Sequence, residues 1–544
     1  MIKEIKHDFK ENPYKFYLFA AFIVWCVAGL FFHELWRDEA QAYLIVRDCS
    51  LSETIGRLKT EGHPILWFLL NYPFVKLGMG VWSLKILSVS FAIGACYMVC
   101  FKLRVNNFYR LLFVLFTPLL FQYGIVARSY SVGLFFALLA LGYYHKRNDN
   151  KSFFMYGLSL AVMCQVSVSF AVIAGAFIAM DILYALFDKR LTLLLSSYTF
   201  WINFLLFAVS AFVMLYMVAP GSYYEEYQEL STGFSAFTDV LGTEYTLSPL
   251  GFTVSFIAVL GVLFGWFPLA MHTYAVTVLT VLSGIFSYIV FVLVFIMLLK
   301  MNNEKWRSRA VLYFTVFVFA FVLLTMFTQK LWVQHTGVFY VALIIVLTLT
   351  YRDKANDIDK STVTGYSPDK KGYKFVVATF AVMIMGLVFQ PVLALQDVFT
   401  AYGDAENTAE FIKTNGYDND KTLIYTYDEV FCAGIIANLE NIKTFTSPRG
   451  EFSYVKYEGL EKYMQADIDY GAMVEKYGDK YDNILLIVYY VRADYDELCK
   501  FWLPAEEMGK IYGYGGFIAP SEPIYSSPKK INQAEESFYI YKLK

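Results

Sequence analysis

The chain has 544 residues, of which 58% are hydrophobic and only 17% are charged, and its formal net charge is −2. Because about a quarter of the residues in soluble domains are charged, this composition excludes an ordinary soluble protein. The near-zero net charge argues against a nucleic-acid partner. The 51 Phe and 43 Tyr residues suit surfaces that face lipid and the aromatic belts at its edges, so the sequence predicts an integral membrane protein.

The first apolar segment covers residues 16–32 and follows Lys3, Lys6, Lys10 and Lys15. It lacks the small-residue cleavage pattern of a secretory signal peptide, so we expect a retained signal anchor. Basic residues favour the cytoplasmic side of a membrane. This bias predicts that the N-terminus is cytoplasmic and that the next loop lies on the extracytoplasmic side of the cell (inner or plasma) membrane.

An acidic pair, Asp38 and Glu39, follows this span in a loop that we expect to cover residues 35–62. Carboxylates are costly so close to lipid, and an acidic pair there indicates a functional site. Later in the loop, Ser50 and Glu53 have the spacing of a capping box. Apolar residues follow at helical spacing, which predicts a short amphipathic helix on the membrane surface.

Further apolar stretches follow along the chain. Residues 64–77 are short and contain Pro73, so we expect a helix against the outer leaflet there. Residues 251–270 are long enough to span, but a crossing would move two basic loops outside, so we expect an interfacial or re-entrant segment. By apolar length we expect about eleven spans. They cover residues 16–32, 81–101, 111–123, 131–144, 153–165, 167–187, 193–218, 274–299, 311–327, 337–350 and 375–392.

From residue 396 onward the composition is that of a soluble domain. Predicted strands alternate there with predicted helices, which is typical of a small α/β layer. The strands cover residues 422–427, 483–491 and 537–543, and the helices cover 405–413, 428–439 and 493–502. We therefore predict a transmembrane domain over 1–395 and an extracytoplasmic α/β domain over 396–544. Cys432 and Cys499 lie in the second domain, and the sequence leaves open whether they pair.

The predicted orientation gathers polar side chains at the outer face, whereas the cytoplasmic ends of the spans carry the usual basic anchors. An acidic pair and several cations beside lipid suit one reaction in particular. An anionic lipid phosphate is held there while an acceptor hydroxyl loses its proton. The set consists of Asp38, Glu39, His63, Lys85, Arg128, Tyr130, Glu225, Glu226, Lys330 and His335.

Four short motifs occur in a characteristic order within residues 10–395. They are Asp38-Glu39-Ala40 after the first span, His63-Pro64 before the short apolar helix, Ala127-Arg128-Ser129-Tyr130 opening a later span, and Gln334-His335-Thr336-Gly337 opening another. In this order the chain resembles the GT-C membrane glycosyltransferases. Within them it is similar to the family 39/83 branch, which includes protein O-mannosyltransferases and the aminoarabinose transferases of lipid A. The expected fold is thus a polytopic, all-α GT-C bundle with a C-terminal α/β domain.

The resemblance implies an inverting transfer of a sugar from a polyprenyl-phosphate donor to an extracytoplasmic glycolipid, polysaccharide or protein. Asp38 would be the general base, and Glu39 would be the second acid of the catalytic pair. Lys85, Arg128 and Lys330 would hold the donor phosphate, as point charges or as a fork. The residues expected to contact substrate are His63, Tyr130, His335, Glu225 and Glu226.

The chain departs from the family pattern in three places. Some members have an acid just before the Arg-x-Tyr motif, where residues 122–126 of this chain contain none. In this chain Glu225 or Glu226 would then supply the acid that those members have before the Arg-x-Tyr motif. Relatives often have His where this chain has Gln165, and Arg where it has Lys85.

Other interpretations stay open. Asp38 beside Arg37 is also explained by an interfacial ion pair, and a divalent metal is possible at His63, Glu61 and His335. Since that spacing matches no recognised ligand pattern, no cofactor is predicted. The alternative functions are a transporter or flippase of lipid-linked sugars and a non-catalytic cell-envelope assembly protein. Transporters usually have internal repeats and charges near the midplane, and the sequence shows no clear repeat.

Overall fold

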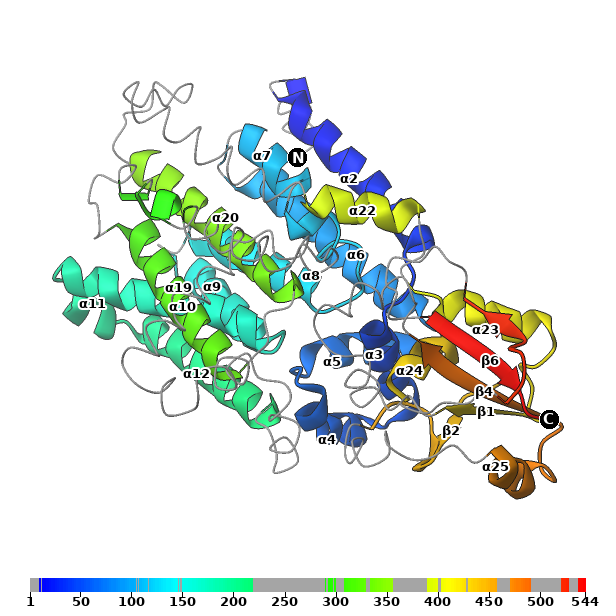
Figure 1. Cartoon of the computed structure of the whole chain (residues 1–544). Helices are drawn as coiled ribbons and strands as arrows, with labels where there is room; N and C mark the ends of the chain where they lie inside the picture. Colours follow the sequence, from blue (N-terminus) through cyan, green and yellow to red (C-terminus); the bar gives the residue numbers. More distant parts are fainter. Residues whose placement is uncertain are drawn as a thin grey trace. The chain divides into compact units, whose positions relative to one another are not determined.

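The computed structural model in Figure 1 is mostly helical. It describes residues 9–218, 308–328, 333–355, 389–399, 403–456, 470–490, 520–527 and 537–544, with a few residues between 289 and 299 and without positions 11, 104, 106, 116, 145, 147, 148, 427 and 428. Among these residues, four helices are long and apolar enough to cross a membrane. The chain is therefore a multi-pass membrane protein. The four are α2 (Pro13–Phe32), α6 (Trp82–Tyr97) with its π-helical extension η1 (Met98–Lys102), α10 (Val168–Phe187) and α12 (Tyr198–Val218).

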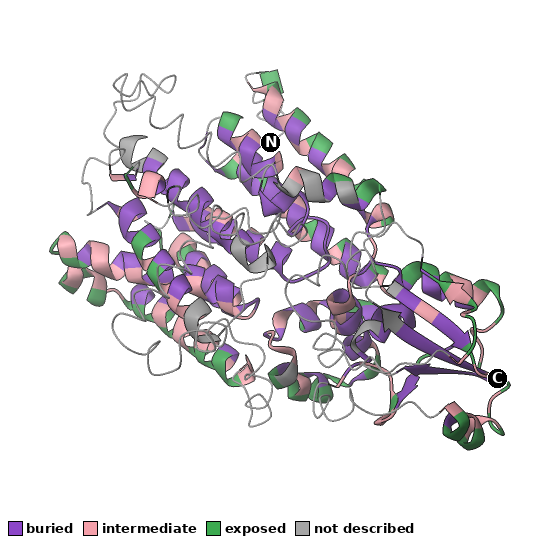
Figure 2. Cartoon of the chain, in the orientation of Figure 1, coloured by how far each residue is buried: buried purple, intermediate pink, exposed green. Residues whose placement is uncertain are grey.

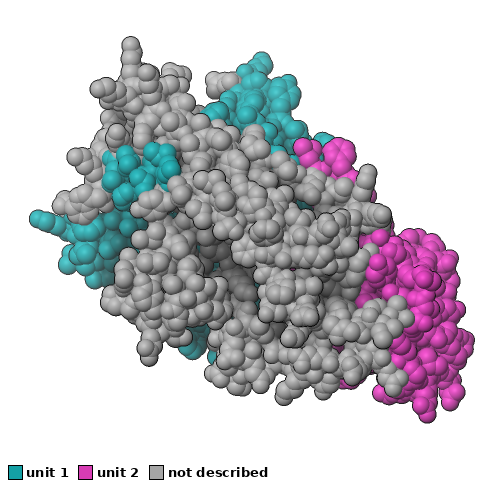
Figure 3. Space-filling model, in the orientation of Figure 1, with its two compact units in different colours: residues 1–28, 61–67, 88–393 teal, residues 29–60, 68–87, 394–544 magenta. Residues whose placement is uncertain are grey.

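The chain divides into two compact units, which Figure 3 shows in different colours. Unit 1 comprises residues 1–28, 61–67 and 88–393. Unit 2 comprises residues 29–60, 68–87 and 394–544. The sequence predicts a second domain over 396–544 alone, whereas unit 2 also includes two stretches from the N-terminal part of the chain.

Unit 1 is built from helices that pack in series. Helix α8 (Tyr130–Tyr144) packs on α9 (Asn150–Cys164), α9 on α12 and α10, α10 on α19 (Arg309–Thr328), and α19 on α20 (Val333–Ala355). Figure 2 shows buried residues along most of α8 and α20. Aromatic rings fill the interior, and the ring centroids of Tyr144 and Tyr156 lie 5.6 Å apart. The other described elements of unit 1 are α7 (Asn107–Leu115), η2 (Pro118–Leu120) and α11 (Leu191–Leu195).

The predicted span over residues 111–123 is wrong, because helix α7 ends at Leu115. The cause is Pro118, since a residue before proline is disfavoured in the helical region. Thr117 is extended and its hydroxyl accepts a hydrogen bond of 3.3 Å from the N–H of Leu119, which starts the short 3-10 helix η2. Turns carry the chain onward to the start of α8. The apolar stretch is therefore buried as irregular backbone inside unit 1.

The other predicted spans divide into three groups. Those over 131–144, 153–165, 167–187, 311–327 and 337–350 coincide with α8, α9, α10, α19 and α20. The predicted span over 193–218 begins later, at Tyr198, because the short helix α11 and two serines precede it. Segments 251–270, 274–299 and 375–392 lie wholly or largely outside the described residues. The total of about eleven spans stays a prediction.

The expected outer loop over residues 35–62 is almost entirely helical. It forms α3 (Arg37–Asp48) and α4 (Leu51–Glu61), and α5 (Leu66–Lys76) follows with Pro73 inside it. The predicted capping box of α4 is confirmed. The N–H of Ser50 donates to Glu53 at 2.7 Å, and the N–H of Glu53 donates to the Ser50 hydroxyl at 3.3 Å. Helix α3 was not expected, and it carries the acid pair.

The C-terminal part of unit 2 contains a six-stranded sheet in the order β3-β2-β1-β4-β6-β5. Strands β2, β1 and β4 are parallel, and the outer strands β3, β6 and β5 are antiparallel to their neighbours. The apolar run of β4 suits a central strand that is buried on both faces. The strands are β1 (Thr422–Thr426), β2 (Phe445–Ser447), β3 (Gly450–Phe452), β4 (Asn483–Tyr490), β5 (Tyr525–Ser526) and β6 (Ser537–Lys542).

Among the described residues of the C-terminal part of unit 2, four helices accompany this sheet. They are α22 (Phe389–Phe399), most of which belongs to unit 2, α23 (Ala405–Thr414), α24 (Glu429–Asn438) and α25 (Tyr470–Tyr477). Helix α24 contacts α23 and also α3 (Figure 1). An α/β arrangement is thus present where the sequence predicts one. That it is a separate extracytoplasmic domain stays a prediction.

Gly124 occupies a turn of unit 1 that has no room for a side chain. A Cβ atom built there would lie 2.1 Å from the carbonyl oxygen of Leu119. Because overpacking costs about 1–3 kcal/mol, Gly124→Ala should lower the free energy of unfolding by that amount. Gly56→Ala in α4 is the control, since its Cβ would meet nothing within 4 Å. Thermal unfolding of both variants in detergent checks this, and equal midpoints would contradict the expectation.

Candidate active site

The acid pair lies in the first turn of α3, and its two side chains have opposite surroundings. Glu39 is fully buried, and its Oε2 accepts a hydrogen bond of 2.7 Å from the backbone N–H of Trp36, just before the helix. The Asp38 side chain is 41% exposed, and its Oδ1 lies 3.9 Å from Nε of Arg37. Exposed ion pairs contribute at most about 1 kcal/mol. Of the two carboxylates, Asp38 is the one that is exposed to solvent.

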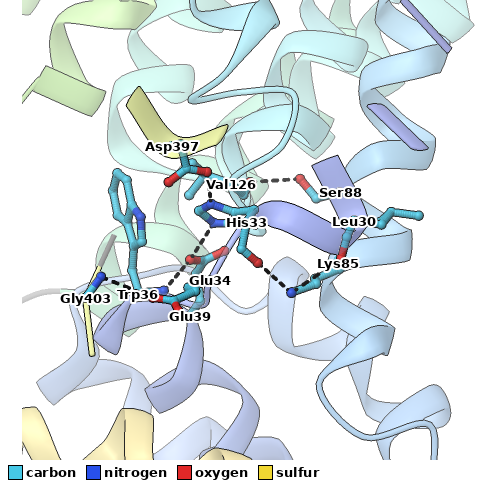
Figure 4. Close-up of polar contacts among 10 residues, drawn as sticks. All are labelled: Leu30, His33, Glu34, Trp36, Glu39, Lys85, Ser88, Val126, Asp397 and Gly403. Carbon is cyan, nitrogen blue, oxygen red and sulfur yellow. Dashed lines mark hydrogen bonds and ion pairs between the residues drawn. The ribbon is translucent and has the colours of Figure 1, made fainter. Parts of the chain in front are cut away.

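Glu39 belongs to a buried group of charges centred on His33, which Figure 4 shows. The Nε2 atom of His33 lies 3.2 Å from Oε2 of Glu39, and its Nδ1 atom lies 2.9 Å from Oδ2 of Asp397 in α22. All three side chains are at most 2% exposed. An ionised carboxylate only accepts hydrogen bonds, so both ring nitrogens of His33 donate and the ring is an imidazolium. We call His33, Glu39 and Asp397 the histidine clamp.

The clamp sets the ionisation of His33. Burial by itself lowers the pKa of His33, but the charges of Glu39 and Asp397 and the hydrogen bonds to both outweigh it and raise this pKa from 6.5 to about 9. Because the pKa is higher in the folded chain, the clamp's contribution to stability is fully present below about pH 6.5. It is lost as the pH rises through about 9.

Lys85, a predicted phosphate ligand, lies in α6, and its ammonium group contacts the end of α2. Its ammonium group donates to the carbonyl oxygen of His33 at 2.7 Å and to that of Leu30 at 3.5 Å. A lysine in this position satisfies the last carbonyls of a helix and complements its dipole. The formal charges of Lys85 and the histidine clamp sum to zero, with two cations and two anions. The described contacts of Lys85 are therefore those of a residue that stabilises this corner of unit 2.

A second polar group lies in unit 1 and contains three predicted site residues. Nη2 of Arg128 lies 2.7 Å from Nε2 of His63. Arginine has donors only, so His63 accepts at Nε2 and carries its proton on Nδ1 as a neutral ring. The guanidinium carbon lies 5.7 Å from the ring centroid of Tyr130, which stacks on Tyr123 with centroids 5.0 Å apart. This group presents a largely buried guanidinium held by a histidine and aromatic rings.

The remaining predicted site residues are not placed in full. His335 lies in the first turns of α20, and its side chain is outside the described residues. Lys330, Glu225 and Glu226 also lie outside them. Their predicted roles stay predictions, as does the metal alternative that includes His335. Of the two C-terminal cysteines, Cys432 is buried in α24 and Cys499 is not described.

Sequence reasoning missed three residues around α3. His33 and Asp397 belong to the clamp, and Gln41 lies in the second turn of α3 with 3% exposure. The one available signal for Asp397 was its position as the first acid after the last predicted span. Nothing in the local sequence links it to His33, which is 364 positions away.

Comparisons with known proteins give similarities in structure only. No family model matches the chain, and no curated protein sequence matches it. The crystal structure of ArnT from Cupriavidus metallidurans in the apo state is similar over 98% of this chain and 98% of that one, with 12% identity and a TM-score of 0.47. The cryo-EM structure of arabinofuranosyltransferase AftD from Mycobacteria is similar over 88% of this chain and 35% of that one, with 12% identity and a TM-score of 0.37.

Both similarities have TM-scores below 0.5. At these TM-scores they say nothing about the chemistry of this chain, for which the contacts of its own residues are the evidence.

Proposed function

We propose that this chain is an inverting membrane glycosyltransferase that moves a sugar from a polyprenyl-phosphate donor to an extracytoplasmic acceptor hydroxyl. The observation that carries the proposal is the difference in solvent exposure between the two acids of the pair. Glu39 is buried in the clamp, whereas Asp38, one residue earlier in the same turn, is 41% exposed. In the proposal, Glu39 holds the start of α3 and Asp38 faces the reactants.

In the proposed reaction, Asp38 is the general base. Its carboxylate takes the proton of the acceptor hydroxyl while the hydroxyl oxygen bonds to the anomeric carbon of the donor sugar. The bond from that carbon to the phosphate oxygen breaks in the same displacement, and the lipid phosphate leaves with the electron pair. The positive N-terminal end of the α3 dipole favours the charged form of the base at the outset.

The departing phosphate gains charge and requires a cation. Arg128 is our first candidate, because the forked guanidinium suits phosphate and its contacts within unit 1 hold it in place. Lys85 is a weaker candidate, since its ammonium already donates to the end of α2. Glu39 is proposed as a residue that supports Asp38. The N-terminus is proposed to be cytoplasmic and residues 396–544 to be extracytoplasmic.

The test begins by identifying the donor. Cells that lack the protein should accumulate one lipid-linked sugar, which mass spectrometry identifies. Purified protein in liposomes, given that labelled donor and an envelope extract as acceptor, should release polyprenyl phosphate in step with glycosylated product. The anomeric configuration of the product, measured by NMR, should be inverted. Movement of intact donor across the bilayer without bond cleavage would instead establish a flippase.

A further inference from the structure

Helix α3 is held by the C-terminal part of unit 2 at several points along its length. Such contacts are unexpected for a segment that directly follows the first membrane helix. They make the position of the proposed base, Asp38, depend on residues that are distant in the sequence. Helix α3 also packs against α24. The polar contacts of this segment are His33 with Asp397 at 2.9 Å, Glu34 with the N–H of Gly403 at 3.3 Å, Gln41 with Val455, and Arg47 with the carbonyl oxygen of Lys443 at 2.8 Å.

The contact in the middle of α3 is a double hydrogen bond. The side-chain amide of Gln41 donates to the carbonyl oxygen of Val455 at 2.9 Å, and its oxygen accepts from the N–H of Val455 at 2.9 Å. The side chain thereby satisfies both polar groups of one residue, as a neighbouring strand would. Both residues are buried. This pair fixes the rotation of α3 about its own axis, on which the direction of Asp38 depends.

The contact at the start of α3 is the histidine clamp. The groups that face His33 are Glu39 from α3, Asp397 from α22 and the ammonium of Lys85 from α6 on its carbonyl oxygen, with Glu34 next in the chain. Because Glu39 also accepts from the N–H of Trp36, the clamp fixes the backbone at which α3 begins. Asp38 lies between the residues that the clamp holds.

We propose that His33, Asp397 and Gln41 are positioning residues that let the C-terminal part of the chain aim Asp38 at the acceptor. The inference rests on the proposed function for the role of Asp38. A base acts only within hydrogen-bond reach of the proton, and a displacement of 1 Å costs about 100-fold in rate. Contacts that fix both the start and the rotation of a helix supply this accuracy.

The kinetic test compares Asp397→Asn with Asp181→Asn. Asp181 is also buried, in α10 of unit 1, where it accepts a hydrogen bond of 3.2 Å from the Tyr156 hydroxyl. Asp397→Asn should lower kcat by about 10- to 100-fold with little change in KM, since the donor site is intact but the base is misplaced. The Asp181→Asn variant should have the wild-type kcat when the rate is divided by the concentration of folded protein. Equal kcat values for the two variants would overturn the proposal.

The pH dependence of kcat separates positioning from general destabilisation. Wild-type kcat should fall as the pH rises through about 9, where the His33 imidazolium loses its proton. Asp397→Asn should move this fall to lower pH, because one anion that stabilises the imidazolium is gone. His33→Gln should remove the fall. A His33→Gln variant with wild-type kcat and an unchanged alkaline fall would overturn the proposal.

A measurement that needs no activity distinguishes this proposal from the proposed function. Amide hydrogen exchange of residues 37–48 in the full-length protein should be slow at pH 7, and His33→Gln or Gln41→Ala should accelerate it there selectively. If wild-type protein turns over no donor but both variants show this acceleration, the glycosyltransferase function is refuted and the positioning of α3 by these contacts is retained. Unchanged exchange in both variants would refute the positioning role.

Discussion

Replacing Asp38 with asparagine should lower the rate of sugar transfer by about 10²- to 10⁴-fold, the range that a positioned general base contributes. Asparagine has the same shape but no basic oxygen, so the acceptor keeps its proton during attack. The fold should survive, because the Asp38 side chain is 41% exposed and its ion pair with Arg37 is long. Release of polyprenyl phosphate by purified variant and wild type measures the effect.

The matched control for this variant lies at the other end of the same helix. Asp48 is also preceded by an arginine, and its Oδ2 lies 2.7 Å from Nη2 of Arg47. Asp48→Asn is therefore the same substitution in the same helix, next to an arginine as in Asp38→Asn. It should leave the rate of sugar transfer within a few-fold of wild type. If Asp38→Asn turns over donor as fast as Asp48→Asn, Asp38 is not the base.

Replacing Arg449 with alanine should cost about 3–5 kcal/mol of unfolding free energy, because it leaves a buried carboxylate without its cation. Nε of Arg449 donates to Oε1 of Glu429 at 2.8 Å, and its Nη2 donates to the other carboxylate oxygen. The two side chains are 7% and 2% exposed. The Ser447 hydroxyl also donates to Glu429, at 2.5 Å. Hydrogen exchange of β1 and β2, together with thermal unfolding, measures the loss.

Two further variants show that the cost comes from burial. Arg190→Ala breaks a pair with Asp188 whose side chains are 71% and 39% exposed, and it should cost less than about 1 kcal/mol. Arg449→Met combined with Glu429→Leu removes both charges and should regain most of the lost stability, since apolar replacements of buried pairs are often neutral. Similar losses for Arg190→Ala and Arg449→Ala would contradict this account.

The sequence predicts those parts of the fold that are determined by residues close together in the sequence. The capping box of Ser50 and Glu53 starts α4 as expected, because both partners lie within one helical turn. The apolar run at 483–490 is long enough to identify β4 as a buried strand. Apolar length likewise locates α2, α10 and α12, since crossing a bilayer requires about twenty residues.

The sequence does not predict the structure where it depends on distant residues or on the details of the backbone. The apolar stretch at 111–123 has the composition of a span, but Pro118 ends the helix and turns it into a buried corner. Helix α3 has a polar sequence and gains its burial from the C-terminal part of unit 2, which no local pattern reveals. For the same reason His33 and Asp397 were not predicted as partners. The predicted importance of the acid pair did not depend on such contacts.

The discontinuity of unit 2 has a consequence for biosynthesis. Residues 29–60 and 68–87 leave the ribosome early, and residues 394–544 follow only after the whole of 88–393. At about 5–20 residues per second, that interval lasts roughly 15–60 s. During it the nascent chain holds His33 and Glu39 without Asp397, and Gln41 without Val455. Under the proposed function, a newly inserted chain would therefore transfer sugar slowly until residues 394–544 have been translated, which would spare the lipid-linked donor from use by an unfinished enzyme.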